Sequence, residues 1–209
     1  MIDMKEITLA SFINEVIDVA TERGQAQLMS FTKKIAPLSF LDAFDSLAGK
    51  GKERLFWMNH TQDFKLFGIG SVRKIVAHEN RYRNLQKAWE QVINNAYIHN
   101  PFTDSGTGLT AIGGMSFDPL REKSVLWRNF PTSQLTIPAY LLVYNNGNYY
   151  FTVNRYIDGN DQVQEIIAEI ETFERKLHVP NDTPSFTEQS IVEKNEIAPE
   201  RWKNSVAKA

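Results

Sequence analysis

The chain has 209 residues and a formal net charge of −2, with 42% apolar residues, 23% charged residues and no cysteine. These proportions are typical of a globular protein, and a chain of this length buries roughly 70% of the surface that it exposes when unfolded. The balanced charge argues against a protein that binds nucleic acid through its phosphates. Without cysteine, the chain has no disulfides, thiol nucleophiles, iron–sulfur clusters or cysteine-ligated zinc.

Neither the apolar runs nor the first residues indicate a membrane-bound or secreted protein. The apolar runs stay below the roughly 18 residues that a membrane-spanning helix requires. The segment from Met1 to Glu6 mixes acidic and basic residues, which is not the pattern of a secretory signal peptide. We therefore expect a cytoplasmic protein with no membrane partner and, given its charge, no nucleic-acid partner.

The spacing of apolar residues predicts five helices. Three are full amphipathic helices, at residues 12–23, 85–96 and 161–177. A shorter helix begins at Ser39 and ends near Gly49, and a last helix begins at Pro199.

Strands and turns fill most of the remaining sequence. Alternating or continuous apolar runs predict strands at residues 25–35, 55–58, 64–69, 109–117, 135–143 and 149–153. A polar turn joins the second and third strands, and Asn146-Gly147 predicts a type I′ hairpin turn between the last two. Pro138 lies inside the strand at 135–143, so we expect an edge or a bulge there.

Hairpin-linked strands dominate over regular alternation of strand and helix. The sequence therefore predicts an α+β fold, in which helices pack on an antiparallel β-sheet scaffold. A proline-rich polar stretch follows the fourth helix. We expect a first unit at residues 1–178, a linker at 179–198 and the start of a second unit at 199–209.

Motifs that carry chemistry are scarce. The triad Gly106, Gly108 and Ala111 satisfies a dinucleotide-binding spacing, but it follows a proline-containing loop and leads into a predicted strand, so we do not interpret it as a nucleotide site. Carboxylates do not pair on any predicted buried face. None of the four histidines has the spacing of a metal-ligand pair: they are His60, His78, His99 and His178.

The aromatic and basic residues have structural interpretations. Each tryptophan lies in an apolar pattern and is expected in the core: Trp57, Trp89, Trp127 and Trp202. The basic residues near the start of the second full helix are expected on a solvated face: Arg81, Arg83 and Lys87.

An ordered set of motifs resembles a known family. Gly113-Gly114-Met115-Ser116-Phe117-Asp118-Pro119 precedes Leu126-Trp127-x-x-Phe130, and Ile137-Pro138-Ala139-Tyr140-Leu141-Leu142 follows. This succession resembles the N-terminal half of chorismate-utilising enzymes, particularly the menaquinone-type isochorismate synthases. Arg54-Leu55-Phe56-Trp57 followed by Phe67-Gly68-Ile69-Gly70 resembles the early hairpin of that half, and Trp202-x-x-x-Val206 resembles the helix that introduces the catalytic half.

The resemblance implies a fold of large antiparallel sheets packed with helices, and a reversible isomerisation of chorismate. Water adds at one ring carbon while the hydroxyl on another leaves. In the family, a lysine is the general base for the water and a glutamate is the general acid for the leaving hydroxyl. Further glutamates hold Mg²⁺ against the substrate carboxylate, which the cation neutralises.

The family's catalytic motifs follow the helix that begins here at Pro199, and this sequence ends at Ala209. Lys208 belongs to that helix and is not the counterpart of the base lysine. The resemblance therefore transfers no catalytic, substrate-binding or metal-binding residue to this chain, and Mg²⁺ is expected in the parent enzyme only. Residues of the resembling motifs are expected to pack in the scaffold: Phe117, Trp127, Phe130 and Ile137.

We thus expect the N-terminal part of an isochorismate synthase, inactive alone, with two partners: chorismate, in the parent enzyme, and the catalytic half of the same polypeptide. One alternative is a parent that makes anthranilate, aminodeoxychorismate or salicylate, although the L-L-E-S feedback motif of anthranilate synthases is absent. The other alternative is a free-standing binding module, which would use an exposed apolar patch or a pocket.

Overall fold

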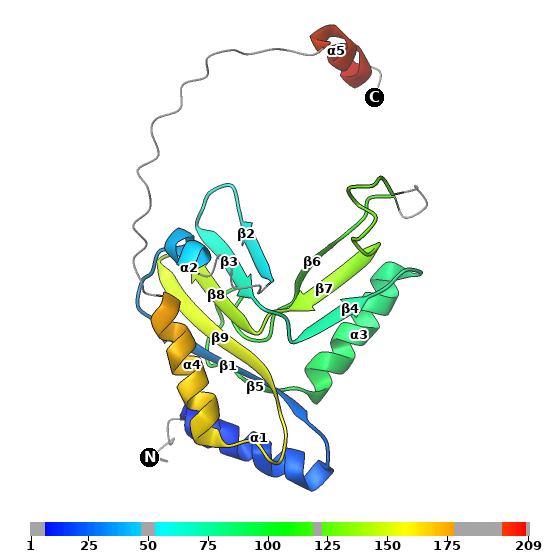
Figure 1. Cartoon of the computed structure of the whole chain (residues 1–209). Coiled ribbons are helices and arrows are strands. Elements are labelled where there is room, and N and C mark those ends of the chain that lie inside the picture. The colour runs from blue at the N-terminus through cyan, green and yellow to red at the C-terminus, as the bar shows by residue number, and fades with distance from the viewer. Residues whose placement is uncertain (1–6, 47–52, 119–122, 178–197, 208–209) are drawn as a thin grey trace.

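The computed structural model describes residues 7–46, 53–118, 123–177 and 198–207 (Figure 1). The elements, in chain order, are α1 (Leu9–Arg23), β1 (Gln27–Ile35), α2 (Phe40–Ser46), β2 (Arg54–Met58), β3 (Phe64–Ile69), β4 (Arg73–Val76), α3 (Arg81–Asn95), β5 (Tyr97–His99), β6 (Ile112–Met115), β7 (Ser133–Ile137), β8 (Tyr140–Asn145), β9 (Asn148–Ile157), α4 (Val163–Leu177) and α5 (Pro199–Ala207).

The strands form two sheets. The larger has the order β2-β3-β8-β9-β1-β5, and the smaller has the order β4-β7-β6. Every pairing is antiparallel except that of β1 with β5. The predicted α+β fold with an antiparallel scaffold is therefore confirmed.

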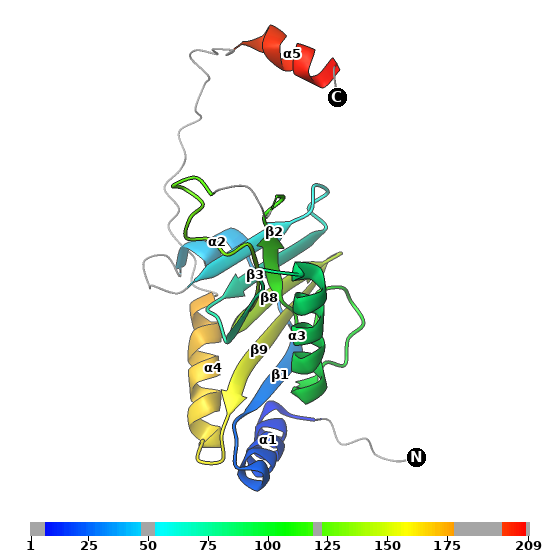
Figure 2. The same cartoon turned by 90° about the vertical axis from the view of Figure 1, so that its right-hand side faces the viewer.

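Helices α1, α2 and α4 cover one face of the large sheet, as Figures 1 and 2 show. The strands alternate their side chains, so every second residue of β1, β8 and β9 points toward these helices. Together they enclose the main core, whose fully buried members include Ile13, Met29, Phe67, Leu142 and Phe151. Burial of this apolar surface is the main force that holds the sheet and helices together.

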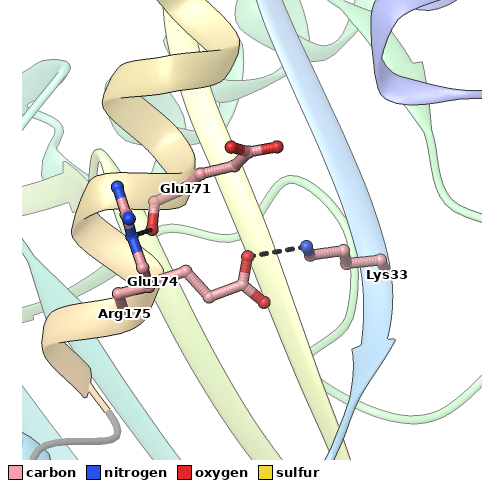
Figure 3. Close-up of polar contacts among 4 residues, drawn as sticks. All are labelled: Lys33, Glu171, Glu174 and Arg175. Carbon is pink, nitrogen blue, oxygen red and sulfur yellow. Dashed lines mark hydrogen bonds and ion pairs between the residues drawn. The ribbon is translucent and has the colours of Figure 1, made fainter.

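A polar tie reinforces the packing of α4 on the sheet. The ammonium Nζ of Lys33, on β1, lies 2.7 Å from Oε2 of Glu174, on α4 (Figure 3). In the same helix, the Nε–H of Arg175 donates to the backbone carbonyl of Glu171. The Lys33–Glu174 pair is partly exposed, so it contributes at most about 1 kcal/mol and mainly fixes the position of the helix.

The opposite face of the large sheet carries α3 and the small sheet, and Figure 2 shows α3 and α4 on opposite sides. Here Leu85 and Val92 of α3 pack with Ile75 of β4, Ile137 of β7 and Leu28 of β1. This second cluster joins the small sheet to the large one.

The predicted strand at 135–143 was wrong, because two strands in different sheets occupy that stretch. β7 pairs with β4 and β6, and β8 pairs with β3 and β9. The break falls at Pro138-Ala139, where proline cannot donate to a ladder. Asn154 of β9 holds the break: its Nδ2 donates to the carbonyl of Pro138 at 2.8 Å, and its backbone N–H donates to the carbonyl of Ala139 at 2.8 Å.

Most other predicted elements are confirmed. Asn146 and Gly147 adopt the positive φ values of 47° and 89° that the β8–β9 turn requires. The strand predicted at 109–117 is shorter, since β6 covers only Ile112–Met115, and the short strands β4 and β5 were not predicted. Helix α5 begins at Pro199 as expected, whereas residues 178–197 lie outside the described part, so the linker stays a prediction.

Candidate functional site

The glycine motif at 106–108 shapes a loop that packs on the large sheet. Gly106 and Gly108 have φ values of 83° and 81°, which side chains other than glycine rarely adopt. A Cβ at Gly106 would lie 2.9 Å from side-chain atoms of both Leu66 and Phe64. The Gly108 N–H donates to the hydroxyl of Thr32 at 3.2 Å. Because a strand and not a helix follows, the motif is structural, in agreement with the sequence interpretation.

The positions of the described histidines do not indicate a catalytic or metal-binding role. His99 stacks on Phe31, with ring centroids 4.8 Å apart, and its ring also lies near Phe12. His60 lies in the β2–β3 turn and His78 between β4 and α3. Within the described ranges, no three His, Cys, Asp or Glu side chains gather into a group able to hold a metal ion.

Three of the described carboxylates form ion pairs between different parts of the fold. Glu53 pairs with Lys74, Glu169 with Arg155, and Glu174 with Lys33. These residues do not provide the oxygen cluster that Mg²⁺ prefers. We therefore assign no metal ion to these carboxylates.

Two tyrosines have strongly raised pKa values. Burial, together with the hydrogen bond that its hydroxyl donates to Asp104 Oδ2, raises the pKa of Tyr150 to about 12. Burial and the nearby carboxylate of Glu169 raise the pKa of Tyr140 to about 12. Both hydroxyls stay protonated at neutral pH, which makes them poor candidates for a general base.

A buried polar stripe crosses β1 and β9 on the face opposite the main core. The hydroxyls of Thr32 and Thr152 are hydrogen-bonded at 2.8 Å, and Ser30 lies across from Asn154 in the strand register. Within the described residues, the Ser30 hydroxyl and the Asn154 Oδ1 lack a hydrogen-bond partner. These groups are neutral, so the stripe offers neither an acid nor a base.

Two depressions mark the surface. One, of about 450 Å³, lies between the end of α1 and the β9–α4 turn and is lined by Gly24, Asp158 and Asn160 among others. The other, of about 180 Å³, lies where β8 begins and includes the Arg155–Glu169 ion pair. In the second, the Tyr140 hydroxyl lies near the Glu169 carboxylate, but that carboxylate pairs with Arg155 and the raised pKa of Tyr140 keeps its hydroxyl protonated.

The most unusual feature of the described surface is its exposed apolar side chains. The described residues between β6 and β7, 116–118 and 123–132, which we call the apolar loop, carry five of them: Phe117, Val125, Leu126, Trp127 and Phe130. Phe117 is fully exposed, and Trp127 is 61% exposed, with its ring 5.2 Å from that of Phe130. Strand β2, at the edge of the large sheet, adds Phe56, Trp57 and Met58.

The prediction that the tryptophans and the motif residues lie in the core was therefore largely wrong. Trp57, Trp127 and Trp202 are exposed, as are Phe117 and Phe130, whereas Ile137 is fully buried and Trp89 packs partly on the second cluster. The pattern around these residues was interpreted correctly as apolar. Among the described residues, Trp57 contacts Phe64 and Trp127 contacts Phe130, but these single contacts leave both tryptophan rings exposed.

The prediction that Arg81 lies on a solvated face was also wrong. Its side chain is buried, with 9% of the residue exposed, and it bonds both ends of the apolar loop. The sequence held a signal for this, because Arg81 lies one helical turn before Leu85 on the apolar stripe of α3. Arg83, two positions on, is exposed as expected.

The described helices are each too short or too polar to cross a lipid bilayer.

Comparisons with known proteins agree with the resemblance in the sequence. The chain is 24% identical, over its whole length, to the isochorismate synthase MenF of Bacillus subtilis (strain 168), and it spans 46% of that relative. A solved structure of the menaquinone-specific isochorismate synthase MenF from Escherichia coli has 13% identity and a TM-score of 0.48, over 83% of this chain and 36% of the other. The sequence profile of the family described as "Chorismate binding enzyme" matches residues 11–209, so the chain belongs to that family.

Proposed function

We propose that this chain is the N-terminal scaffold of an isochorismate synthase, a cytoplasmic enzyme that isomerises chorismate to isochorismate with Mg²⁺. The observation that supports this most is the family match over residues 11–209 of a chain that spans less than half of its relative.

In this proposal the role of the scaffold is structural. The main core is closed by the chain's own helices α1, α2 and α4, so the large sheet forms a stable platform. The catalytic half then supplies the lysine and glutamates that move protons at the two ring carbons, and the glutamates that bind Mg²⁺. This chain alone turns over no chorismate.

The test begins with the gene. We expect the reading frame to continue past the codon for Ala209 into a strand with the base lysine and then into glutamate-bearing segments. A stop codon directly after Ala209 would overturn the proposal.

Activity then identifies the reaction. The polypeptide encoded by the whole gene is incubated with chorismate and Mg²⁺, with the 209-residue chain as the matched control, and products are separated by chromatography. We expect isochorismate from the longer protein and none from the control. Turnover by the control would contradict the missing-site argument. Ammonia-dependent anthranilate or aminodeoxychorismate, or direct salicylate, would assign the parent to another branch of the family.

A binding module remains the second candidate, because the exposed apolar loop is the kind of patch such a module uses. It predicts a protein that ends at Ala209 and binds a ligand or partner without the catalytic half. The gene sequence separates the two candidates.

A further inference from the structure

The two ends of the apolar loop are hydrogen-bonded to each other where they leave the small sheet. Ser116 follows β6 and Thr132 precedes β7, and the backbone N–H of Ser116 donates to the carbonyl of Thr132 at 2.8 Å. Both ends of the loop are therefore fixed to each other, although its described apolar side chains are exposed to solvent.

Arg81, at the start of α3, donates hydrogen bonds to both ends of the loop. One guanidinium nitrogen donates to the Ser116 carbonyl at 2.7 Å, to the Ser116 hydroxyl at 3.0 Å and to the Thr132 carbonyl at 3.2 Å. Burying a guanidinium is costly unless its donors are satisfied. These contacts tie the two loop ends to the helix, so the loop has a fixed base.

The strands that flank the apolar loop lie toward one end of the molecule. In both views, β2 and the outer ends of β6 and β7 lie at the end opposite α1 (Figures 1 and 2). Strand β2 exposes Trp57, whose ring lies 5.6 Å from that of Phe64, and Phe56 points to the other face of the sheet. An apolar surface of this kind, on a fixed base, is typical of an interface.

The length of the relative indicates what covers this end. More than half of that isochorismate synthase has no counterpart in this chain. Helix α5, which follows the predicted linker, also exposes Trp202 and Val206, one turn apart on one face. A polypeptide segment that begins with such a helix can bury the apolar face of the helix only by packing it on another apolar surface.

We propose that the apolar loop is the docking surface for the catalytic half, and that Arg81 is the residue that positions the loop for it. This inference rests on the proposed function, since the partner is the rest of the same polypeptide. Trp127 and Phe130 are the central anchors, because large aromatic side chains contribute most to such interfaces.

Side-chain footprinting tests the docking surface without using activity. Hydroxyl-radical labelling is measured residue by residue in the 209-residue chain and in the polypeptide encoded by the whole gene. We expect labelling of Phe117, Trp127 and Phe130 to fall at least about fivefold in the longer protein, because interface cores are packed like interiors. Tyr156, an exposed aromatic residue near the end of β9, is the internal control and should change little.

The outcomes separate this inference from the proposed function. Equal labelling of the loop in a longer protein that produces isochorismate would overturn the docking surface and leave the function standing. Protection in a longer protein that does not convert chorismate would support docking and overturn the function. Protection that appears in the 209-residue chain alone, with a concentration-dependent dimer, would assign the surface to a second copy and overturn the inference.

Variants of Arg81 test the positioning role. In the longer protein, Arg81→Met should restore loop labelling by at least about threefold while the circular dichroism spectrum stays native, and Arg81→Lys should show a smaller rise because it keeps a donor. Arg83→Met, an exposed arginine on the same helix, is the matched control. If Arg81→Met folds and its loop stays protected, Arg81 does not position the loop.

Discussion

On the helix-covered face of the large sheet, Phe67 and Phe151 are fully buried, whereas Phe117 and Trp127 in the apolar loop are largely exposed. The residue types are alike in the two regions. The difference lies in the neighbours: α1, α2 and α4 pack on the first region, and no described element covers the second. Whether a side chain is buried therefore depends on which part of the polypeptide packs on it, and aromatic character alone does not predict burial.

The largest effect is expected in the covered region. Phe151→Ala removes a ring that is fully buried in the main core, and we expect it to lower the free energy of unfolding by about 3–5 kcal/mol. Guanidinium denaturation of the 209-residue chain measures the change. Leu41→Ala, at an exposed apolar position on α2, is the control and should stay within about 0.5 kcal/mol. Equal effects of the two variants would mean that the covered face is not the stabilising core.

The base of the exposed region is tested by two adjacent glycines in β6. A Cβ at Gly113 would lie 1.9 Å from the backbone oxygen of Gln134 on β7, whereas a Cβ at Gly114 meets no atom within 4 Å. Gly113→Ala should therefore force the two strands apart and lower the free energy of unfolding by about 2–3 kcal/mol.

Gly114→Ala is the matched control, expected within about 0.5 kcal/mol of the parent chain, and thermal denaturation followed by circular dichroism compares the two. A tolerated Gly113→Ala would show that the β6–β7 pairing does not hold the loop's base.

The covered region was also the more predictable from sequence. The helices α1 and α4 followed from apolar spacing, because each packs one stripe on a sheet within the same chain. The β8–β9 hairpin followed from the local demand of Asn146-Gly147 for positive φ. Local rules failed where a long-range choice decided the structure, as at Pro138, where one apolar run divides between two sheets.

The exposed region could not be predicted from the same rules. Trp127 and Phe130 stand in an apolar pattern that looks the same whether the covering element is near in sequence or far away. The burial of Arg81 depends on carbonyls contributed by residues 35 and 51 positions later, which no local pattern encodes. Only its place on the apolar stripe of α3 gave a clue.

Tyr150 offers a smaller test, on the face of the large sheet that α3 and the small sheet share. Its pKa is raised to about 12, above the ordinary value of 10.0, so its neutral form is favoured in the folded state. The stabilisation is present below about pH 10 and is lost as pH rises toward 12. Tyr150→Phe should cost about 1 kcal/mol at neutral pH through the lost hydrogen bond to Asp104, and it should flatten the decline of stability above pH 10.

Urea denaturation at several pH values measures this decline, and absorbance at alkaline pH follows tyrosine ionisation directly. An unchanged alkaline decline in Tyr150→Phe would assign the loss of stability to Tyr140, whose pKa is also raised to about 12.

The smallest effect on the 209-residue chain is expected from Trp127→Ala, although it deletes the largest type of side chain. The ring contacts Phe130 but is 61% exposed, so its loss should change the free energy of unfolding by no more than about 0.5 kcal/mol. The same substitution in the polypeptide encoded by the whole gene should cost several times more, because there the ring would be an interface anchor. A large cost already in the 209-residue chain would mean that the loop is packed within it. A negligible cost in both proteins would remove Trp127 from the docking surface and leave the two regions different only in their local neighbours.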